Sequence, residues 1–196
     1  MEGNLEYIMV LFMEPPIEYI ENYLDYSIDS FFEEMDKLDW EKRGSTPRYE
    51  YYTNLLNVPY IYGRGNGVRQ YEPKEIPSFV DFLRNLLQSK MDVKFEVCFM
   101  NKYTELKEHL GWHSDDSPEM DNERPIVIYS LGASREIWFR PKGDKRPEMV
   151  YKKLLKSNSV LVMEPGMQLE WEHRIPKCDR ECDTRISLTY RGYVEP

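Results

Sequence analysis

The chain has 196 residues, 41% of them hydrophobic and 14% aromatic, which suits a single domain over residues 1–196 with a sizeable core. The sequence has no apolar run near the roughly 20 residues of a membrane span and no signal-peptide pattern at its start, so we expect no membrane partner. The three cysteines, Cys98, Cys178 and Cys182, argue against a disulfide scaffold and favour a reducing intracellular compartment, cytoplasm or nucleus. We expect a monomer.

The net charge of −9 argues at first against a nucleic-acid partner, but the charge is unevenly distributed. Residues 1–40 contain eleven acidic residues and one basic residue, so the rest of the chain is nearly neutral. The stretch from Arg140 to Lys156 contains seven basic residues and two acidic ones. It is either a basic patch that meets phosphates or a solvated loop.

The first half of the chain predicts helices among short strands and loops. Residues 7–13 are typical of a buried strand, and Ser27 to Leu38 of a short helix with Ser27 as its N-cap. Residues 44–77 are rich in Gly, Pro, Asn and Tyr, which indicates loops and short strands. A clearer helix begins at Ser78, with Asp81 as its capping-box partner.

The second half predicts strands separated by turn residues. The expected strands are 94–100, 125–131, 134–140, 159–163 and 185–191. Residues 1–90 thus form a helix-bearing N-terminal part, and 91–196 an all-β core. Short, evenly spaced strands are typical of a sandwich, a barrel or a jelly roll.

Two of the three histidines suggest a metal site. His113 and Asp115 are two residues apart, so in an extended segment both side chains point to the same side. His173 follows sixty residues later. Two histidines and one carboxylate form the facial triad of non-heme iron(II) oxygenases. Zinc, or a pair of merely hydrogen-bonded histidines, remains open at this point. His109 is interpreted as a loop residue without a role.

The last predicted strand, 185–191, adds a second feature. Arg185, Ser187, Thr189 and Arg191 share one of its faces. The two arginines, about 20 Å apart at Cα, could bracket a small dicarboxylate, because a guanidinium grips a carboxylate with two charge-assisted hydrogen bonds. Asn101 and Tyr103 are again two residues apart and can add hydrogen bonds. This combination favours 2-oxoglutarate as a cosubstrate.

Several motifs taken together resemble the AlkB family, and within it the eukaryotic-type homologues that repair alkylated DNA. In chain order they are Thr46-Pro47-Arg48, Tyr60-Ile61-Tyr62-Gly63, Asn101-Lys102-Tyr103, Gly111-Trp112-His113-Ser114-Asp115-Asp116, Ser130-Leu131-Gly132-Ala133, Trp171-Glu172-His173 and the 185–191 strand.

The resemblance implies a mostly β fold (α+β), with a double-stranded β-helix (jelly-roll) core at 91–196, N-terminal helices and a nucleotide-recognition lid within 1–90. It implies Fe(II), 2-oxoglutarate and O2 as cofactors and cosubstrates. The implied iron ligands are His113, Asp115 and His173. The implied 2-oxoglutarate residues are Asn101, Tyr103, Arg185, Ser187 and Arg191, with Arg185 at the distal carboxylate and Arg191 nearer the metal. Arg48, Tyr60, Tyr62 and Asp116 would bind the substrate, and no catalytic residue beyond the metal ligands is implied.

Three positions depart from the family's pattern. The family often has Asn where Ser187 stands, often Glu where Ser117 stands, and usually Gly near Leu106. Ser187 bears on cosubstrate affinity, and Ser117 bears on base recognition.

The implied reaction is oxidative demethylation of 1-methyladenine and 3-methylcytosine in DNA, a direct-reversal repair that releases formaldehyde and succinate. Three alternatives stay open: an RNA demethylase or base-modifying hydroxylase of the same fold, a protein hydroxylase, and a catalytically silent nucleic-acid-binding module. Cys178 and Cys182 are interpreted as incidental loop thiols, exposed to oxidation by their nearness to the iron.

Overall fold

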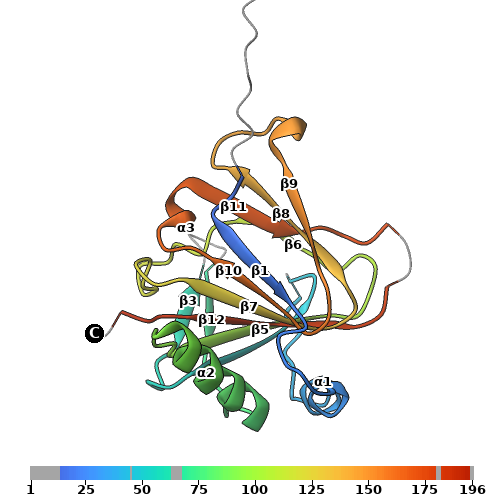
Figure 1. Cartoon of the computed structure of the whole chain (residues 1–196), viewed down its shortest axis with the longest axis vertical. Coiled ribbons are helices and arrows are strands. Elements are labelled where there is room, and N and C mark those ends of the chain that lie inside the picture. The colour runs from blue at the N-terminus through green and yellow to red at the C-terminus, as the bar shows by residue number, and fades with distance from the viewer. Residues whose placement is uncertain (1–13, 45, 63–67, 180–181, 195–196) are drawn as a thin grey trace, which may run out of the picture.

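The computed structural model describes residues 14–44, 46–62, 68–179 and 182–194. The strand expected at 7–13 lies outside these residues. The described part consists mainly of two antiparallel sheets, and its two longer helices lie on one side of the larger sheet (Figure 1). This arrangement confirms the predicted mostly β, jelly-roll fold. No helix in the described ranges is long and apolar enough to cross a membrane.

The larger sheet has six strands in the order β1-β10-β7-β12-β5-β2, all neighbours antiparallel. In chain order they are β1 (Ile17–Glu21), β2 (Tyr49–Asn54), β5 (Val97–Tyr103), β7 (Ile126–Gly132), β10 (Ser159–Met163) and β12 (Arg185–Arg191). All seven residues of β12 are buried, because this strand lies between β7 and β5 near the middle of the sheet.

The smaller sheet has four strands in the order β6-β11-β8-β9. They are β6 (Leu110–His113), β8 (Arg135–Pro141), β9 (Tyr151–Leu155) and β11 (Trp171–Ile175). A separate hairpin pairs β3 (Tyr60–Tyr62) with β4 (Arg69–Tyr71). The remaining elements are α1 (Asp29–Asp36), α2 (Ser78–Met91), the one-turn 3-10 helix η2 (Pro147–Met149) and α3 (Met167–Glu170).

Three apolar clusters join these layers. The first packs α1 and α2 onto the large sheet, and includes Phe79 and Leu83 from α2 against Tyr129 and Leu188. The second fills the space between the two sheets, with Ile128 and Leu161 facing Phe139 and Trp171. The third lies under the hairpin and is made mostly of tyrosines with Val97 and Phe99. The large sheet is therefore packed on both faces, against the helices on one side and against the small sheet on the other.

The predicted strand positions are mostly correct. The bounds of 159–163 and 185–191 match β10 and β12, and β7 and β8 begin one residue late. The strand expected at 94–100 lies at 97–103 instead. The backbone before it is held by side chains: Gln88 Oε1 accepts from Phe95 N, and Arg124 donates to the Lys94 carbonyl. Four strands, β1, β6, β9 and β11, were not predicted from the sequence; the first three are sheet edges, where polar residues are common.

The expected helix caps were wrong. Ile28, not Ser27, is the N-cap of α1, and the Ser27 hydroxyl instead bonds to Asp29 just inside the helix. Pro77 is the N-cap of α2, and no capping box forms. Ser78 Oγ donates to Glu34 on α1, and Asp81 binds the side chains of Arg84 and Asn85. Tertiary and side-chain partners thus compete with local capping.

The cysteine interpretation also needs correction. The structure joins Cys178 and Cys182 in a disulfide, whereas Cys98 is free and buried. The segment after β11 turns back toward Arg135, which contacts Cys182 Sγ and donates to the Pro176 carbonyl. Cys178 and Cys182 are therefore bonded to each other and are not incidental thiols.

Candidate metal centre and active site

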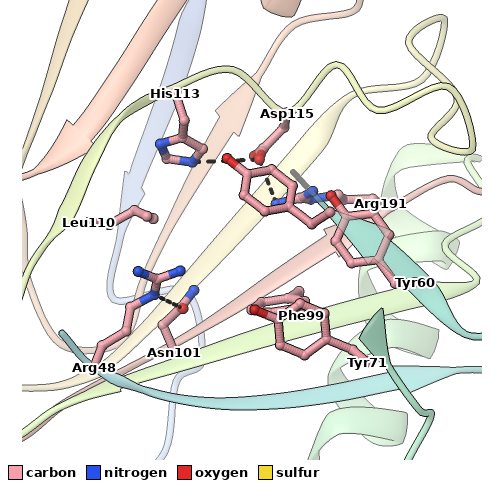
Figure 2. Close-up of a pocket in the computed structure, with 10 residues that line it drawn as sticks. Arg48, Tyr60, Tyr71, Phe99, Asn101, Leu110, His113, Asp115 and Arg191 are labelled. Atoms are coloured by element: carbon pink, nitrogen blue, oxygen red, sulfur yellow. Dashed lines mark hydrogen bonds and ion pairs between the residues drawn. The ribbon is translucent and has the colours of Figure 1, made fainter. Parts of the chain in front are cut away.

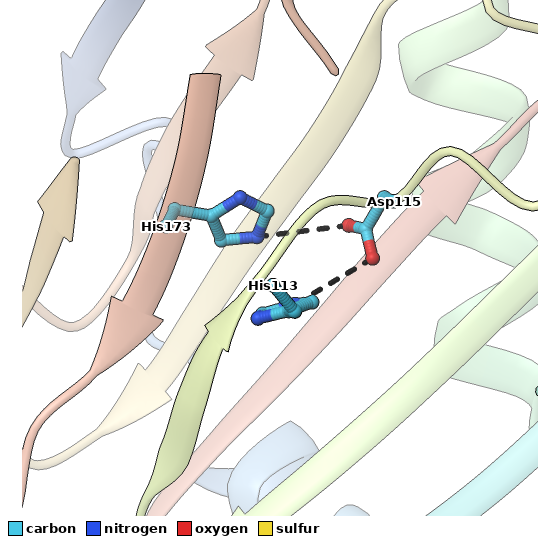
Figure 3. Close-up of side chains that lie close together, drawn as sticks. All are labelled: His113, Asp115 and His173. Atoms are coloured by element: carbon cyan, nitrogen blue, oxygen red, sulfur yellow. Dashed lines mark ion pairs between the residues drawn. The ribbon is translucent and has the colours of Figure 1, made fainter. Parts of the chain in front are cut away.

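His113, Asp115 and His173 lie together in the space between the sheets (Figure 3). His113 ends β6 and pairs directly with His173 on β11, so the two imidazoles share one face of adjacent strands. Their ring centroids are 4.2 Å apart. Asp115 Oδ1 is 3.6 Å from His113 Nε2, and its Oδ2 is 3.7 Å from His173 Nε2. The three ligand atoms lie within 4.8 Å of one another, which one metal ion can bridge.

Asp115 reaches this cluster by a different route from the one expected. β6 ends at His113, so strand alternation alone does not place the carboxylate. Gln168 on α3 accepts a hydrogen bond from the Asp115 backbone N–H at 2.9 Å. On the other side, Arg191 Nη2 lies 2.8 Å from Asp115 Oδ1. The loop after β6 is therefore held at its backbone and at its side chain.

The environment sets protonation states that suit metal binding. Burial lowers the pKa of His173 to about 3. His113 also lowers this pKa, whereas Asp115 acts to raise it. Burial also lowers the pKa of His113. Burial alone would raise the pKa of Asp115, but Arg191 and the two histidines hold it below its ordinary value. At neutral pH the cluster thus offers neutral imidazoles and an ionised carboxylate, the forms that bind a divalent cation.

A backbone contact orients one of the two rings. The Gly111 carbonyl lies 2.9 Å from His113 Nδ1, which therefore carries the proton and donates to it. The tautomer leaves the lone pair on Nε2, the nitrogen that faces Asp115. This arrangement is typical of a metal-bound histidine.

The predicted cosubstrate residues lie on two paired central strands. In the register of β12 with β5, Arg185 is opposite Tyr103 and Ser187 is opposite Asn101. Their alternation puts these four side chains on the sheet face that looks toward the small sheet, with Ile186 and Leu188 on the helix side. Arg191, at the far end of the same face, is the residue that contacts Asp115.

Several buried donors on this face have no partner among the described residues. They are the Tyr103 hydroxyl, Arg185 Nε and Nη1, and Arg191 Nε. Arg185 Nη2 donates to Ser130 Oγ at 3.0 Å. Burial lowers the pKa of Arg185 to about 10, so the guanidinium still carries its charge at neutral pH. Since buried polar groups are almost always hydrogen-bonded, these donors fit a bound anion with several oxygens.

A pocket opens beside the metal cluster (Figure 2). It is lined by Arg48, Tyr60, Tyr62, Tyr71, Phe99, Asn101, Leu110, His113, Asp115 and Arg191. The structure thus brings seven of the sequence-predicted residues into one cavity. Arg48 Nε donates to Asn101 Oδ1 at 2.7 Å, and Arg48 Nη2 lies 2.6 Å from Glu50. The Tyr60 hydroxyl is 2.9 Å from Ser117 Oγ.

One expected pocket residue lies elsewhere. Asp116 is exposed and pairs with Lys142 at 2.8 Å, and it is not among the residues that line the pocket. Four further residues contribute to the site without a sequence motif: Tyr71 and Phe99 form part of the wall, Gln168 holds Asp115, and Arg135 lies over the Tyr103 ring. No motif marks these four residues, because they reach the site through tertiary packing.

The fold and the site together define a class: a jelly roll that holds two histidines and one carboxylate between its sheets, next to buried arginines suited to a dicarboxylate. The chain belongs to the 2OG-Fe(II) oxygenase superfamily, whose family model matches residues 34–191. Within that superfamily it is an AlkB-like member, because the relatives it matches are AlkB homologues.

Those relatives are distant in sequence. The chain is 29% identical to "Alpha-ketoglutarate-dependent dioxygenase alkB homolog 3" of Bos taurus, over 86% of this chain and 63% of that protein. It is 30% identical to the same-named protein of Homo sapiens, over 58% of this chain and 42% of that protein. It is 27% identical to "DNA oxidative demethylase ALKBH2" of Mus musculus, over 72% of this chain and 69% of that protein.

The chain therefore spans less than two thirds of the alkB homolog 3 proteins that it matches. The solved structure of OsALKBH1 has a TM-score of 0.66 and 17% identity, over 92% of this chain and 98% of that one. At that identity the likeness bears on the fold alone, and it agrees with the jelly-roll architecture.

Proposed function

We propose that the protein is an iron(II)- and 2-oxoglutarate-dependent oxygenase that removes N-linked methyl groups from nucleic-acid bases, with 1-methyladenine and 3-methylcytosine in DNA as its substrates. The observation that carries the proposal is the contact between Arg191 and Asp115. This contact joins the cluster of His113, Asp115 and His173 to β12, whose side chains suit a cosubstrate. The candidate metal site and the candidate cosubstrate site are therefore parts of one active site. An intracellular location and a monomeric state are parts of the same proposal.

In this proposal His113, Asp115 and His173 hold the iron. Asn101, Tyr103, Arg185 and Ser187 hold 2-oxoglutarate, with Arg185 at the carboxylate farther from the metal and Arg191 nearer to it. The buried donors without partners on Tyr103, Arg185 and Arg191 support this role, since a dicarboxylate would satisfy them. Ser187 is shorter than the amide often found there in the family, so it contributes at most one hydroxyl hydrogen bond.

The aromatic pocket would receive the target base. Tyr60 and Tyr62 on the hairpin, with Tyr71 and Phe99 behind Tyr60, form a wall of rings on which a base can stack. Stacking of this kind returns about 1–3 kcal/mol, which offsets part of the cost of taking the base out of a duplex. Arg48, held by Asn101 and Glu50, lies in the same pocket and can meet the base edge or its phosphate.

When bound, iron(II), 2-oxoglutarate and O2 supply the oxidation that turns an N-methyl group into formaldehyde and free base, with succinate and CO2 as the other products. The protein's residues position the reactants. The pocket lies next to His113 and Asp115, so a methyl group on a bound base would point at the metal cluster. Arg191 keeps Asp115 ionised, and the aromatic wall would shield a bound base from water.

The test is turnover of methylated oligonucleotides with iron(II) and 2-oxoglutarate, with succinate and formaldehyde measured together. We expect equal amounts of the two products, and we expect none from Asp115→Ala. The matched control is Asp116→Ala, which removes the neighbouring carboxylate that pairs with Lys142 and should leave iron affinity unchanged.

The outcomes separate the parts of the proposal. Production of succinate without demethylation of DNA or RNA would contradict the proposed nucleic-acid substrate, but it would still support an oxygenase activity. Full turnover by Asp115→Ala would refute the metal assignment. Ser117, which meets Tyr60 where the family often has a carboxylate, favours RNA or a modified base as the second candidate, so the same panel includes RNA oligonucleotides.

A further inference from the structure

A row of alternating cationic and aromatic side chains crosses the outer face of the small sheet. Lys152 on β9 lies over Trp138 on β8, with Nζ 4.2 Å from the ring centroid. Arg174 on β11 contacts both tryptophans. Its guanidinium carbon is 4.2 Å from the ring centroid of Trp138 and 5.1 Å from that of Trp112 on β6. Arg140 lies 4.1 Å from Trp112. We call these five residues the ladder.

Strand register produces the ladder. Trp138 pairs with Lys152 across β8 and β9, and with Arg174 across β8 and β11. Each of these residues alternates with an inward one, such as Ile137 or His173, so the ladder lies on the face opposite the metal cluster. Side-chain hydrogen bonds fix its members: Trp138 Nε1 donates to Glu136 at 2.7 Å, and Arg140 pairs with Glu172 at 2.5 Å.

Two cations of the ladder are available to bind an anion. Arg174 and Lys152 form no ion pair with any acidic residue in the described ranges, and Arg174 Nε has no hydrogen-bond partner there. Trp112, Trp138 and Arg174 are partly exposed, and Lys152 is exposed. A groove along this face is lined by Trp138 and Arg174 together with His109, Leu154 and Lys177. Three acidic residues, Glu136, Asp179 and Asp183, also line it.

The ladder is also continuous with the substrate pocket. β6 is the edge strand of the small sheet, and its Leu110 and His113 line the pocket while its Trp112 belongs to the ladder. A chain that leaves the pocket over this edge meets Trp112 first. The helices α1 and α2 pack on the large sheet, so neither covers this face (Figure 1).

We propose that the ladder binds the single-stranded polynucleotide that flanks the target base. The proposal rests on the proposed function, since it concerns the same substrate. Aromatic and guanidinium planes offer stacking to bases of any sequence, and unpaired cations attract the phosphates. Charge favours this occupant: the ladder places cations on one face of a chain whose net charge is −9.

The test measures binding apart from turnover. Fluorescence anisotropy with the full chain would compare a labelled, unmethylated 20-nucleotide strand, as DNA and as RNA, across salt concentrations. We expect Arg174→Glu and Lys152→Glu each to bind at least about fivefold more weakly, and each to lower the salt slope by about 0.7, the value for one lost phosphate contact on a single strand. Trp138→Ala should weaken binding by about fivefold or more through lost stacking.

The matched control is Lys37→Glu, which makes the same change of charge at the C-cap of α1, where Lys37 is exposed and, among the residues that the structure describes, forms an ion pair only with Glu33. It should bind the strand as the parent does. A second control is a three-nucleotide substrate that fills the pocket but cannot reach the ladder; its KM and kcat should not change in the ladder variants. Lys152 is exposed, so Lys152→Glu keeps the test valid if Arg174→Glu folds poorly.

Parent-like binding by Lys152→Glu and by folded Arg174→Glu would overturn the proposal, as would an equal loss with Lys37→Glu or with the three-nucleotide substrate. Failure of the proposed function looks different. In that case the parent would bind the strand through the ladder without demethylating it, because the anisotropy measurement needs no turnover.

Discussion

Arg191 and Arg185 stand on one face of the same strand but take part in different contacts. Arg191 meets Asp115, so its charge acts on the metal cluster as well as on any ligand beside it. Arg185 is fully buried at the other end, bound to Ser130 and beside the Tyr103 ring. Removing the Arg191 guanidinium should therefore weaken the binding of both iron(II) and 2-oxoglutarate. Removing the Arg185 guanidinium should weaken the binding of 2-oxoglutarate alone.

We expect Arg185→Gln to weaken 2-oxoglutarate binding by about 100-fold and to leave iron affinity unchanged, because a buried, charge-assisted contact is lost. Arg191→Gln should weaken both, since Asp115 loses its ion pair. Isothermal titration with 2-oxoglutarate, and separately with iron(II) under anaerobic conditions, measures each affinity. Equal effects of the two variants on iron would contradict this division.

Gln168 should act as a positioning residue for the metal. Its side chain is buried and accepts from the Asp115 backbone, and Gln168→Leu preserves its size while leaving that N–H unpaired. We expect iron affinity to fall about tenfold, the range for a supporting contact of a metal ligand. The electronic spectrum of a bound cobalt(II) probe should shift as well. Gln70→Leu, an exposed change on β4, should alter neither affinity nor spectrum.

At the scale of elements, β12 serves the core and the site at once. Ile186, Leu188 and Tyr190 pack into the helix-side cluster, while the polar residues between them face the space between the sheets. Such alternation usually marks a strand with one solvated face, but here the polar face is buried as well. A buried polar face needs hydrogen-bond partners, and bound ligands would supply them to β12.

Gly132, at the end of β7, gives a test of the scaffold at a residue that has no side chain in the site, although its backbone pairs with Arg185. Gly132 has a φ of +79°, and a Cβ there would overlap the Thr184 carbonyl and the Phe32 ring. We expect Gly132→Ala to lower the free energy of unfolding by about 2–3 kcal/mol, from backbone strain plus the clash.

Gly143 is the matched control, because it has a similar φ of +80° but open space where a Cβ would lie. Gly143→Ala should cost only the strain, about 1 kcal/mol. Urea denaturation of both variants measures the difference. Equal losses would show that the contacts around Gly132 contribute nothing.

The sequence allowed some parts of this structure to be predicted and not others, for physical reasons. The alternation of 185–191 depends on local geometry, so β12 could be predicted directly, and the residue types of His113, Asp115 and His173 were enough to indicate a metal site. Asp115 is held by Gln168, and Tyr71 lies in the pocket wall, through contacts between distant segments that no short motif encodes. The caps at Ser27 and Ser78 failed because their side chains found other partners.

At the scale of the whole molecule, the metal cluster bridges separate parts of the fold. Its ligands come from β6, from the following loop and from β11, while α3 and β12 hold Asp115 in place. A ligand that binds all of these fastens the small sheet to the large one. Such a ligand binds the folded state and not the unfolded chain, so it must raise stability.

We therefore expect iron(II) at about 100 times its Kd to stabilise the protein by about 2.7 kcal/mol, and 2-oxoglutarate at about 100 times its own Kd to add a similar amount. Each increment corresponds to about 5–11 °C in Tm for a domain of this size. Anaerobic thermal unfolding, followed by circular dichroism, measures the shift. Asp115→Ala should lose the iron-dependent part, because its site lacks the carboxylate. Gly132→Ala should start from a lower Tm and show the full shift, since its defect lies in the scaffold. An undiminished shift in Asp115→Ala would mean that the stabilising ligand binds elsewhere, and the metal assignment would fail with it.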